Sequence, residues 1–209
     1  MVRRLIEFVS PIALVACVSA PPPVGPSVSG VKAERPDVKV GDKYTFSCTQ
    51  GLQSYERHYL TTSVDESSIK YSVDGALLES TREGNPVTEE WVKGERGSHT
   101  DLHLVSFPLE VGKTWTIEDR WERFDLHLQG TQKGRATVVA YKKVRVPAGE
   151  FDAFQVQWAL DFTINTGGAG RNTGTFWYAP SARASVKYAV YMAGEPEFNC
   201  ELNDFQLRP

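Results

Sequence analysis

From about residue 37 onward, apolar side chains recur at every second position rather than at every third or fourth. The clearest run is 154–165, in which alternate residues are apolar and most of the others are polar. The apolar set is Phe154, Val156, Trp158, Leu160, Phe162 and Ile164. A period of two is that of a β-strand with one buried face. At about 3.3 Å per residue this strand would be roughly 40 Å long, which favours a large curved sheet or barrel.

Shorter runs with the same alternation follow one another along the chain. They cover residues 44–48, 69–73, 102–104, 124–128, 186–190 and 198–202. Turn-forming segments, each with a glycine, separate them at 74–75, 83–86, 110–113 and 147–149. No run of ten or more residues has a helical stripe. The sequence therefore predicts an all-β domain over residues 37–209, an antiparallel meander of about ten strands curled into a barrel or half-open barrel.

The beginning of the chain has a different pattern. Arg3 and Arg4 precede a mostly apolar stretch over residues 5–15, which is too short to span a bilayer. It ends in Leu14-Val15-Ala16-Cys17, which resembles the lipobox of bacterial lipoproteins. The resemblance implies that residues 1–16 are a signal peptide and that Cys17 is lipidated. An ordinary secretory signal cleaved near Ala20 is the alternative.

Residues 17–36 are predicted to be a lipidated cysteine followed by an extended, Pro-rich linker. Many lipoproteins retained in the inner membrane carry an aspartate directly after the cysteine, whereas here Val18 and Ser19 follow. The resemblance therefore implies the outer membrane. Removal of residues 1–16 would delete two arginines and one glutamate and leave 21 basic and 25 acidic residues. This acidic balance does not favour nucleic acid as a partner. It also does not attract the domain to an anionic membrane surface, so we expect contact with the membrane through the N-terminal lipid.

Cys48 and Cys200 remain once Cys17 is assigned to the lipid. Each has the parity of the apolar residues around it, so both are expected to face the core. They belong to the first and the last strand of the predicted domain, and exported proteins retain disulfides. The sequence predicts a Cys48–Cys200 disulfide that joins the two ends of the sheet. Two separate buried thiols are the alternative.

Two motifs carry a resemblance that covers about residues 105–190. Residues 146–154 read VPAGEFDAF, and residues 175–180 read TFWYAP, ahead of a strand that begins at Val186. This pattern resembles a loose group of uncharacterised exported bacterial β-proteins, marked by a VPAG-x-F-x-A-F corner and a W-Y-A-P strand. The resemblance implies the fold and no particular activity. The chain is more distantly similar to the half-open barrels of lipoprotein carriers and receptors, from which no individual residue carries over.

Candidate chemistry is confined to a repeated Asp-Leu-His-Leu, at 101–104 and 125–128. If these segments were neighbouring strands, Asp101, His103, Asp125 and His127 could bind zinc or supply an acid–base pair. The alternative, which we favour, is that they are polar residues on the solvated face of two amphipathic strands. The sequence has no G-x-S-x-G elbow and no Walker spacing, and we expect no cofactor. Residues 166–174 are expected to be a flexible, Gly-rich hairpin loop at a pocket rim.

The tryptophans could either line a cavity for an apolar ligand or fill the core. They are Trp91, Trp115, Trp121, Trp158 and Trp177. Trp158 shares the apolar face of its strand and is expected in the core. Trp177 has the opposite parity to Phe176 and Tyr178, which makes it a candidate contact for a ligand or partner.

Three functions remain open from the sequence. The leading one is a non-enzymatic, outer-membrane-anchored module that binds an apolar small molecule or an envelope protein. The second is a structural or scaffolding lipoprotein with a filled core. The third is a metal-dependent or hydrolytic enzyme that uses the Asp-Leu-His-Leu strands.

Overall fold

The computed structural model describes residues 30–90 and 96–209, so the predicted signal peptide, Cys17, the first part of the linker and Trp91 lie outside the described residues. The described residues form fourteen strands and one 3₁₀ helix. The strands are β1 (Lys32–Ala33), β2 (Lys43–Gln50), β3 (Gln53–Val64), β4 (Ser68–Val73), β5 (Ala76–Thr81), β6 (Thr88–Glu90), β7 (Arg96–His99), β8 (Leu109–Glu110), β9 (Thr114–Arg123), β10 (Leu128–Val146), β11 (Gly149–Ile164), β12 (Ala169–Ala179), β13 (Ala184–Tyr191) and β14 (Phe198–Gln206). The 3₁₀ helix covers Pro180–Ala182. None of the described helical structure is long and apolar enough to cross a membrane.

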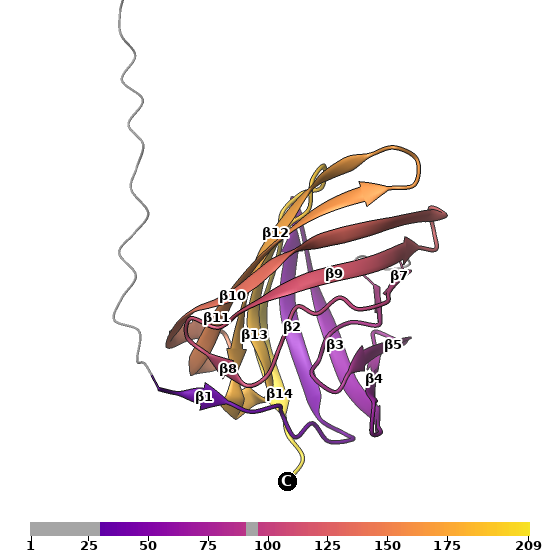
Figure 1. Cartoon of the computed structure of the whole chain (residues 1–209). Helices are drawn as coiled ribbons and strands as arrows, with labels where there is room; N and C mark the ends of the chain where they lie inside the picture. The colour runs from indigo at the N-terminus through magenta and orange to yellow at the C-terminus, as the bar shows by residue number, and fades with distance from the viewer. Residues whose placement is uncertain (1–29, 91–95) are drawn as a thin grey trace, which may run out of the picture.

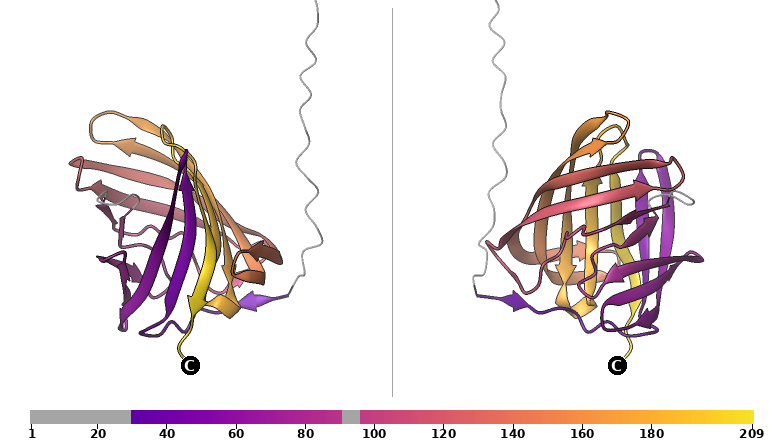
Figure 2. Two further views of the ribbon diagram at one scale, coloured as in Figure 1. Left: turned by 180° about the vertical axis from the view of Figure 1, so that it is seen from behind. Right: turned by 45° about the vertical axis from the view of Figure 1, so that its right-hand side comes forward.

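One antiparallel sheet contains twelve of the strands, in the order β5-β4-β3-β2-β14-β13-β12-β11-β10-β9-β7-β6. The remaining two strands, β1 and β8, pair with each other. The large sheet is strongly curled, so that one of its faces is concave (Figures 1 and 2). Its edges are linked by an isolated bridge between Ser80 and Pro86. The predicted antiparallel meander is therefore confirmed as a curled sheet whose edges are not joined by a continuous ladder.

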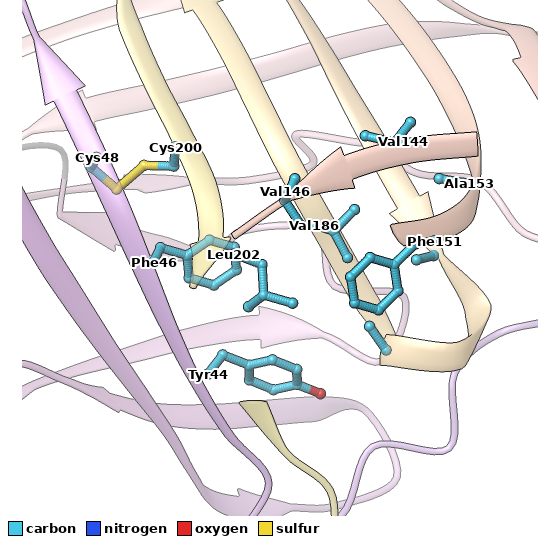
Figure 3. Close-up of a cluster of buried hydrophobic side chains, with 12 residues drawn as sticks. Tyr44, Phe46, Cys48, Val144, Val146, Phe151, Ala153, Val186, Cys200 and Leu202 are labelled. Atoms are coloured by element: carbon cyan, nitrogen blue, oxygen red, sulfur yellow. A yellow bond between two sulfur atoms is a disulfide. The ribbon is translucent and has the colours of Figure 1, made fainter. Parts of the chain in front are cut away.

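The strands of this sheet that come first and last along the chain, β2 and β14, lie side by side in its interior. Their register places Cys48 directly opposite Cys200, and the two residues form the predicted disulfide, with a Cα–Cα distance of 4.1 Å. Figure 3 shows the disulfide beside Phe46 and Leu202, whose side chains continue the cluster toward the end of the β10–β11 hairpin. The disulfide thus joins residues 152 positions apart in the sequence at the seam of the sheet.

The predicted corner at residues 147–149 forms a tight hairpin between β10 and β11. Val146 pairs with Gly149, whose φ of +136° is in the region that favours glycine. A register shift between Val138 and Ala140 interrupts the ladder between these two strands. Such an irregularity changes which face the following residues occupy. The hairpin end therefore places Phe151 in the core cluster around the disulfide, whereas Phe154 belongs to a second cluster.

This second cluster lies beneath the segment that connects β7 with β9. Leu102 and Leu109 from that segment pack against Val156 and Phe176 of the sheet. Ala33 of β1 is buried in the same cluster, because β1 pairs with β8. Packing against the domain therefore begins within residues 30–36, which the sequence pattern assigns to the linker. Residues 30–209 contain every residue of the two clusters and the disulfide, so a chain that starts at residue 18 retains them.

Two predicted strands do not form, for different reasons: side chains bind the backbone groups of one segment, and the other segment is a hairpin turn. In residues 101–106 the Asp119 carboxylate accepts the backbone N–H of Asp101 at 3.0 Å, and the Asn85 side chain binds both the N–H and the C=O of Val105. Residues 124–127 form the turn of the β9–β10 hairpin, where His127 has a φ of +51°. Neither Asp-Leu-His-Leu segment is therefore an amphipathic strand.

We predict that replacing both cysteines, Cys48→Ala with Cys200→Ala, lowers the free energy of unfolding by about 2–5 kcal/mol, because the bridge restricts a long loop in the unfolded chain. Urea denaturation followed by far-UV circular dichroism measures the loss. A reducing agent should shift the wild type by a similar amount and leave the double variant unchanged. Equal denaturation midpoints for the wild type and the double variant would show that the disulfide does not stabilise the fold.

Candidate ligand-binding cleft

The concave face of the sheet forms a cleft of about 570 Å³. This volume lies within the range of about 300–1,000 Å³ that is typical of small-molecule sites. Most of its lining is aromatic or aliphatic: Tyr44, Phe46, Tyr59, Tyr71, Trp121, Trp158, Leu160, Phe162, Phe176, Tyr178, Tyr188, Val190 and Phe198 are among the lining residues. They come from strands on both sides of the β2–β14 seam, so the curl of the sheet creates the cleft.

The segment between β7 and β8 crosses this concave face (Figure 1) and lines the cleft with Leu102, Leu104 and Val105. Leu126, in the β9–β10 turn, also lines it while 54% exposed. Burial raises the pKa of the Tyr178 hydroxyl and of the Tyr188 hydroxyl. Both hydroxyls therefore remain neutral at physiological pH.

Glycines on neighbouring strands make room for the large aromatic side chains of the cleft. Trp158 on β11 is opposite Gly174 on β12, and Phe162 is opposite Gly170. A Cβ atom added at Gly174 would overlap the Trp158 ring, and one at Gly170 would lie 2.8 Å from Phe162 Cζ. The aromatic rings therefore lie across positions that have no side chain. The predicted Gly-rich loop is shorter than expected, because β12 begins at Ala169 and contains both of these glycines.

Three arginines contribute charge to the cleft lining: Arg57, Arg123 and Arg183. Arg123 forms a two-point ion pair with Asp125, at 3.0 and 2.8 Å. Arg183 donates to the Arg208 carbonyl at 3.1 Å and lies 3.6 Å from the Asp42 carboxylate. Arg57 is 9% exposed, and its guanidinium carbon lies 5.5 Å from the centre of the Tyr59 ring.

A buried polar network forms one wall of the cleft. The Asp119 carboxylate is 2.6 Å from His99 Nδ1 and accepts a hydrogen bond from Gln132 Nε2 at 2.8 Å. Its second oxygen accepts the backbone N–H groups of Thr100 and Asp101, each at 3.0 Å. The His99 and Gln132 side chains line the cleft. Asp119 thus connects β9 with β10 and with the start of the segment that crosses the concave face.

Two opposing effects act on the Asp119 carboxyl. Burial alone would raise its pKa, but the hydrogen bonds from His99, from the Asp101 N–H and from Gln132 lower the pKa below the usual value of 3.8. The ionised form is therefore the one that the folded protein stabilises.

The structure separates the residues of the predicted metal site. His103 pairs with Glu83, with 3.1 Å between His103 Nε2 and Glu83 Oε2, and its Nδ1 lies 3.7 Å from Asp101. The hydrogen bond from Arg123 lowers the pKa of Asp125, which lies in the β9–β10 turn with His127. Within residues 30–90 and 96–209, no group of three or more His, Cys, Asp and Glu side chains could hold a metal ion.

Trp177 and Trp158 differ from their expected environments in opposite ways. Trp177 is half-buried against the cluster around the disulfide, and Lys187 Nζ lies 5.6 Å from the centre of its ring. Trp158 was expected in the core but is half-buried and lines the cleft. The role of Trp177 as a ligand or partner contact stays a prediction.

Neither Arg57 nor Asp119 was predicted from the sequence to be a site residue. Asp119 follows Glu118, and the alternation of β9 indicates that the two point to opposite faces, as their burial shows. A carboxylate on the face of Ile117 and Trp121 is a usable signal of a buried polar group. Arg57 similarly shares the parity of the aromatic residues Tyr55 and Tyr59, and a cation on an aromatic face is the comparable signal.

Comparison with known proteins identifies the class of fold. The chain matches no family model and no curated protein sequence. It is similar to the structure of a candidate exported protein with a YmcC-like fold from Bacteroides fragilis, with 13% identity, coverage of 83% of this chain and 99% of that one, and a TM-score of 0.50. It is also similar to the hypothetical lipoprotein YmcC from Escherichia coli, with 15% identity, coverage of 79% and 84%, and a TM-score of 0.51.

A candidate lipoprotein from Parabacteroides distasonis is similar to the same extent, with 11% identity, coverage of 83% of this chain and 99% of that one, and a TM-score of 0.51. At these identities the likeness establishes the fold alone. The chain therefore has a YmcC-like fold, a curled antiparallel sheet with a concave face.

We predict that Gly174→Ala lowers the free energy of unfolding by about 1–3 kcal/mol, because the added methyl group overlaps the Trp158 ring. Gly168→Ala is the control, since its methyl group would meet only the side chain of Ile164, at 3.1 Å. Urea denaturation compares the two. In a Trp158→Leu background the effect of Gly174→Ala should largely disappear, and an equal loss in both backgrounds would contradict the proposed overlap.

We further predict that Asp119→Asn lowers the free energy of unfolding by about 3–5 kcal/mol at pH 7, because a buried network loses its charged acceptor. The folded-state pKa of Asp119 is lower than its unfolded value, so its contribution is complete above about pH 4 and declines as the pH falls through the folded-state pKa. The difference between wild type and variant should therefore narrow at pH 3. Urea denaturation at both pH values measures it, with the exposed neighbour Glu118→Gln as a control expected to change stability by about 0.5 kcal/mol or less.

Proposed function

We propose that this protein is a bacterial envelope lipoprotein whose domain holds an apolar small molecule in the cleft of its curled sheet. The observation that carries the proposal is the cleft of about 570 Å³, whose lining is mainly aromatic and aliphatic. A scaffold with a filled core would bury these side chains against one another. Here Trp158, Phe162 and Val190 instead line the cleft and are only half-buried.

The balance of polar and apolar groups supports binding rather than catalysis. Large apolar walls with a few polar groups are typical of ligand sites, in which the walls supply affinity and the polar groups fix orientation. The His99–Asp119–Gln132 network has a structural explanation, because Asp119 fixes the segment that crosses the concave face. We therefore prefer a carrier or receptor role to the metal-dependent or hydrolytic alternative.

The proposed anchor is the lipidated Cys17, in the outer membrane, with the domain in the periplasm or at the cell surface. Support for the anchor comes from the Leu14-Val15-Ala16-Cys17 sequence, and support for the outer membrane from Val18 and Ser19 after it. Lipid attached at such a cysteine would hold the domain at the membrane permanently. The cleft would then take up a ligand from, or deliver it to, an envelope partner.

We predict that Val190→Trp weakens binding of the neutral apolar probe N-phenyl-1-naphthylamine at least about tenfold, because the larger ring occupies the cleft. Fluorescence titration of residues 18–209, exported to a periplasm and purified without detergent, measures the affinity. Ala189→Trp is the matched control, since Ala189 is the preceding residue of β13, is also half-buried and does not line the cleft.

Native mass spectrometry of the same wild-type protein provides an independent measurement. An added mass of several hundred daltons that is lost on denaturation would support the proposal, and its fragmentation would identify the ligand class. Absence of both a bound mass and probe binding in the wild type would contradict the proposed function.

A further inference from the structure

Arg57 is the most unusual polar residue of the cleft. Its side chain projects from β3 on the same face as Tyr59, and its backbone position is directly opposite Phe46 of β2. The residue is only 9% exposed. Of the three arginines that line the cleft, Arg123 and Arg183 have carboxylate partners. In residues 30–90 and 96–209, the guanidinium of Arg57 has neither a carboxylate at ion-pair distance nor a hydrogen-bond acceptor.

The contact of Arg57 with Tyr59 does not replace such a partner. A cation near an aromatic ring is stabilised by the electrons of the ring face. The guanidinium also has five N–H donors in its plane, and a ring face offers no carboxylate or carbonyl oxygen to them. Arginine is almost never this deeply buried without an ionic partner, because removing its charge from water is unfavourable.

Four glutamates line the cleft, namely Glu79, Glu83, Glu90 and Glu195, and among the described residues none lies at ion-pair distance from Arg57. Two of them have partners elsewhere. Glu83 lines the cleft and pairs with His103 at 3.1 Å, and Glu90 lies 3.8 Å from Arg96. A second cation, Arg82, lies near Tyr71, which contacts Tyr59, the aromatic neighbour of Arg57. Tyr59 packs edge-on against Tyr71, with 6.3 Å between ring centres. Burial raises the pKa of the Tyr71 hydroxyl, and the positive charge of Arg82 opposes that rise.

Arg82 itself has a buried Nη1 group without a hydrogen-bond partner among the described residues. Arg82 is not a lining residue, but its charge acts on Tyr71, which lines the cleft, in a protein whose formal net charge is −3.

We propose that the ligand of the cleft is an anionic amphiphile, a single-chain lipid whose carboxylate or phosphate head group binds the Arg57 guanidinium while its hydrocarbon chain packs along the aromatic walls. This inference rests on the proposed function and specifies the ligand class. A carboxylate or phosphate matches the planar donor pattern of a guanidinium and forms two parallel hydrogen bonds with it. The chain explains why most of the remaining lining is aromatic or aliphatic.

The test compares head groups on one chain. Dodecanoate, dodecyl phosphate and dodecanol, all below their micellar concentrations, compete with bound N-phenyl-1-naphthylamine in wild-type residues 18–209, in Arg57→Met and in Arg145→Gln. Arg145 is the control, because its side chain is 84% exposed. The measured quantity is the ratio of the dodecanol dissociation constant to that of each anionic ligand.

We expect this ratio to fall about tenfold or more in Arg57→Met and to remain unchanged in Arg145→Gln, since coupling between close charge pairs is typically at least about tenfold in affinity. A change confined to dodecanoate or to dodecyl phosphate identifies the head group. A ratio that is the same in wild type and Arg57→Met overturns the inference but leaves an apolar ligand possible. Failure of the probe and of all three ligands to bind the wild type removes the proposed function as well.

A second comparison needs no variant and therefore does not depend on the folding of Arg57→Met. Dodecyltrimethylammonium has the same chain as dodecanoate and a cationic head. The acidic protein as a whole should favour the cation, whereas Arg57 favours the anion. We expect dodecanoate to bind at least about tenfold more tightly, and the opposite order overturns the inference.

Discussion

The rest of the structure depends on the pairing of β2 with β14, the strands of the large sheet that come first and last along the chain. The β2–β14 ladder joins segments that are far apart in the sequence, and the Cys48–Cys200 disulfide fixes that ladder covalently. Without this seam, strands β2 to β5 and strands β9 to β14 would be two separate meanders, each with one exposed apolar face. With it they form one curled sheet whose concave face brings Arg57 of β3 and Trp158 of β11 to the same cleft.

The curl leaves an apolar concave face that the protein only partly covers with its own chain. Leu102 and Leu109 of the β7–β9 connection fill one part of it and form a continuous cluster with Phe154 and Phe176. The other part stays as the cleft. Asp119 binds the backbone at Thr100 and Asp101, where the covering segment begins. A buried carboxylate thus holds the start of the segment that covers part of the apolar face.

Alternation predicted the strands, and parity predicted the disulfide, because both depend on which face of a strand a residue occupies. The hairpin at 147–149 was predictable for a similar local reason, since Gly149 adopts a positive φ. Residues 101–106 also alternate, yet Asn85 and Asp119, which are distant in sequence, bind their backbone groups and replace a strand partner. No local pattern contains that information. The cleft was unpredictable for a related reason, because the alternation that marks Trp158 as buried does not distinguish packing against protein from lining a cavity.

The pairing of aromatic residues with glycines shows how the cleft keeps its shape without a filled interior. A ring that lies across Gly174 or Gly170 is supported by the backbone of the neighbouring strand and does not need another side chain above it. The charge of Arg57 has no comparable support. The Tyr59 ring contacts the guanidinium but offers no carboxylate or carbonyl oxygen to its N–H donors. The apolar walls are therefore stable as they stand, while the cationic position is stabilised fully only when an anion binds there. For the proposed anionic amphiphile, this difference assigns head-group specificity to Arg57 and affinity for the hydrocarbon chain to the apolar walls.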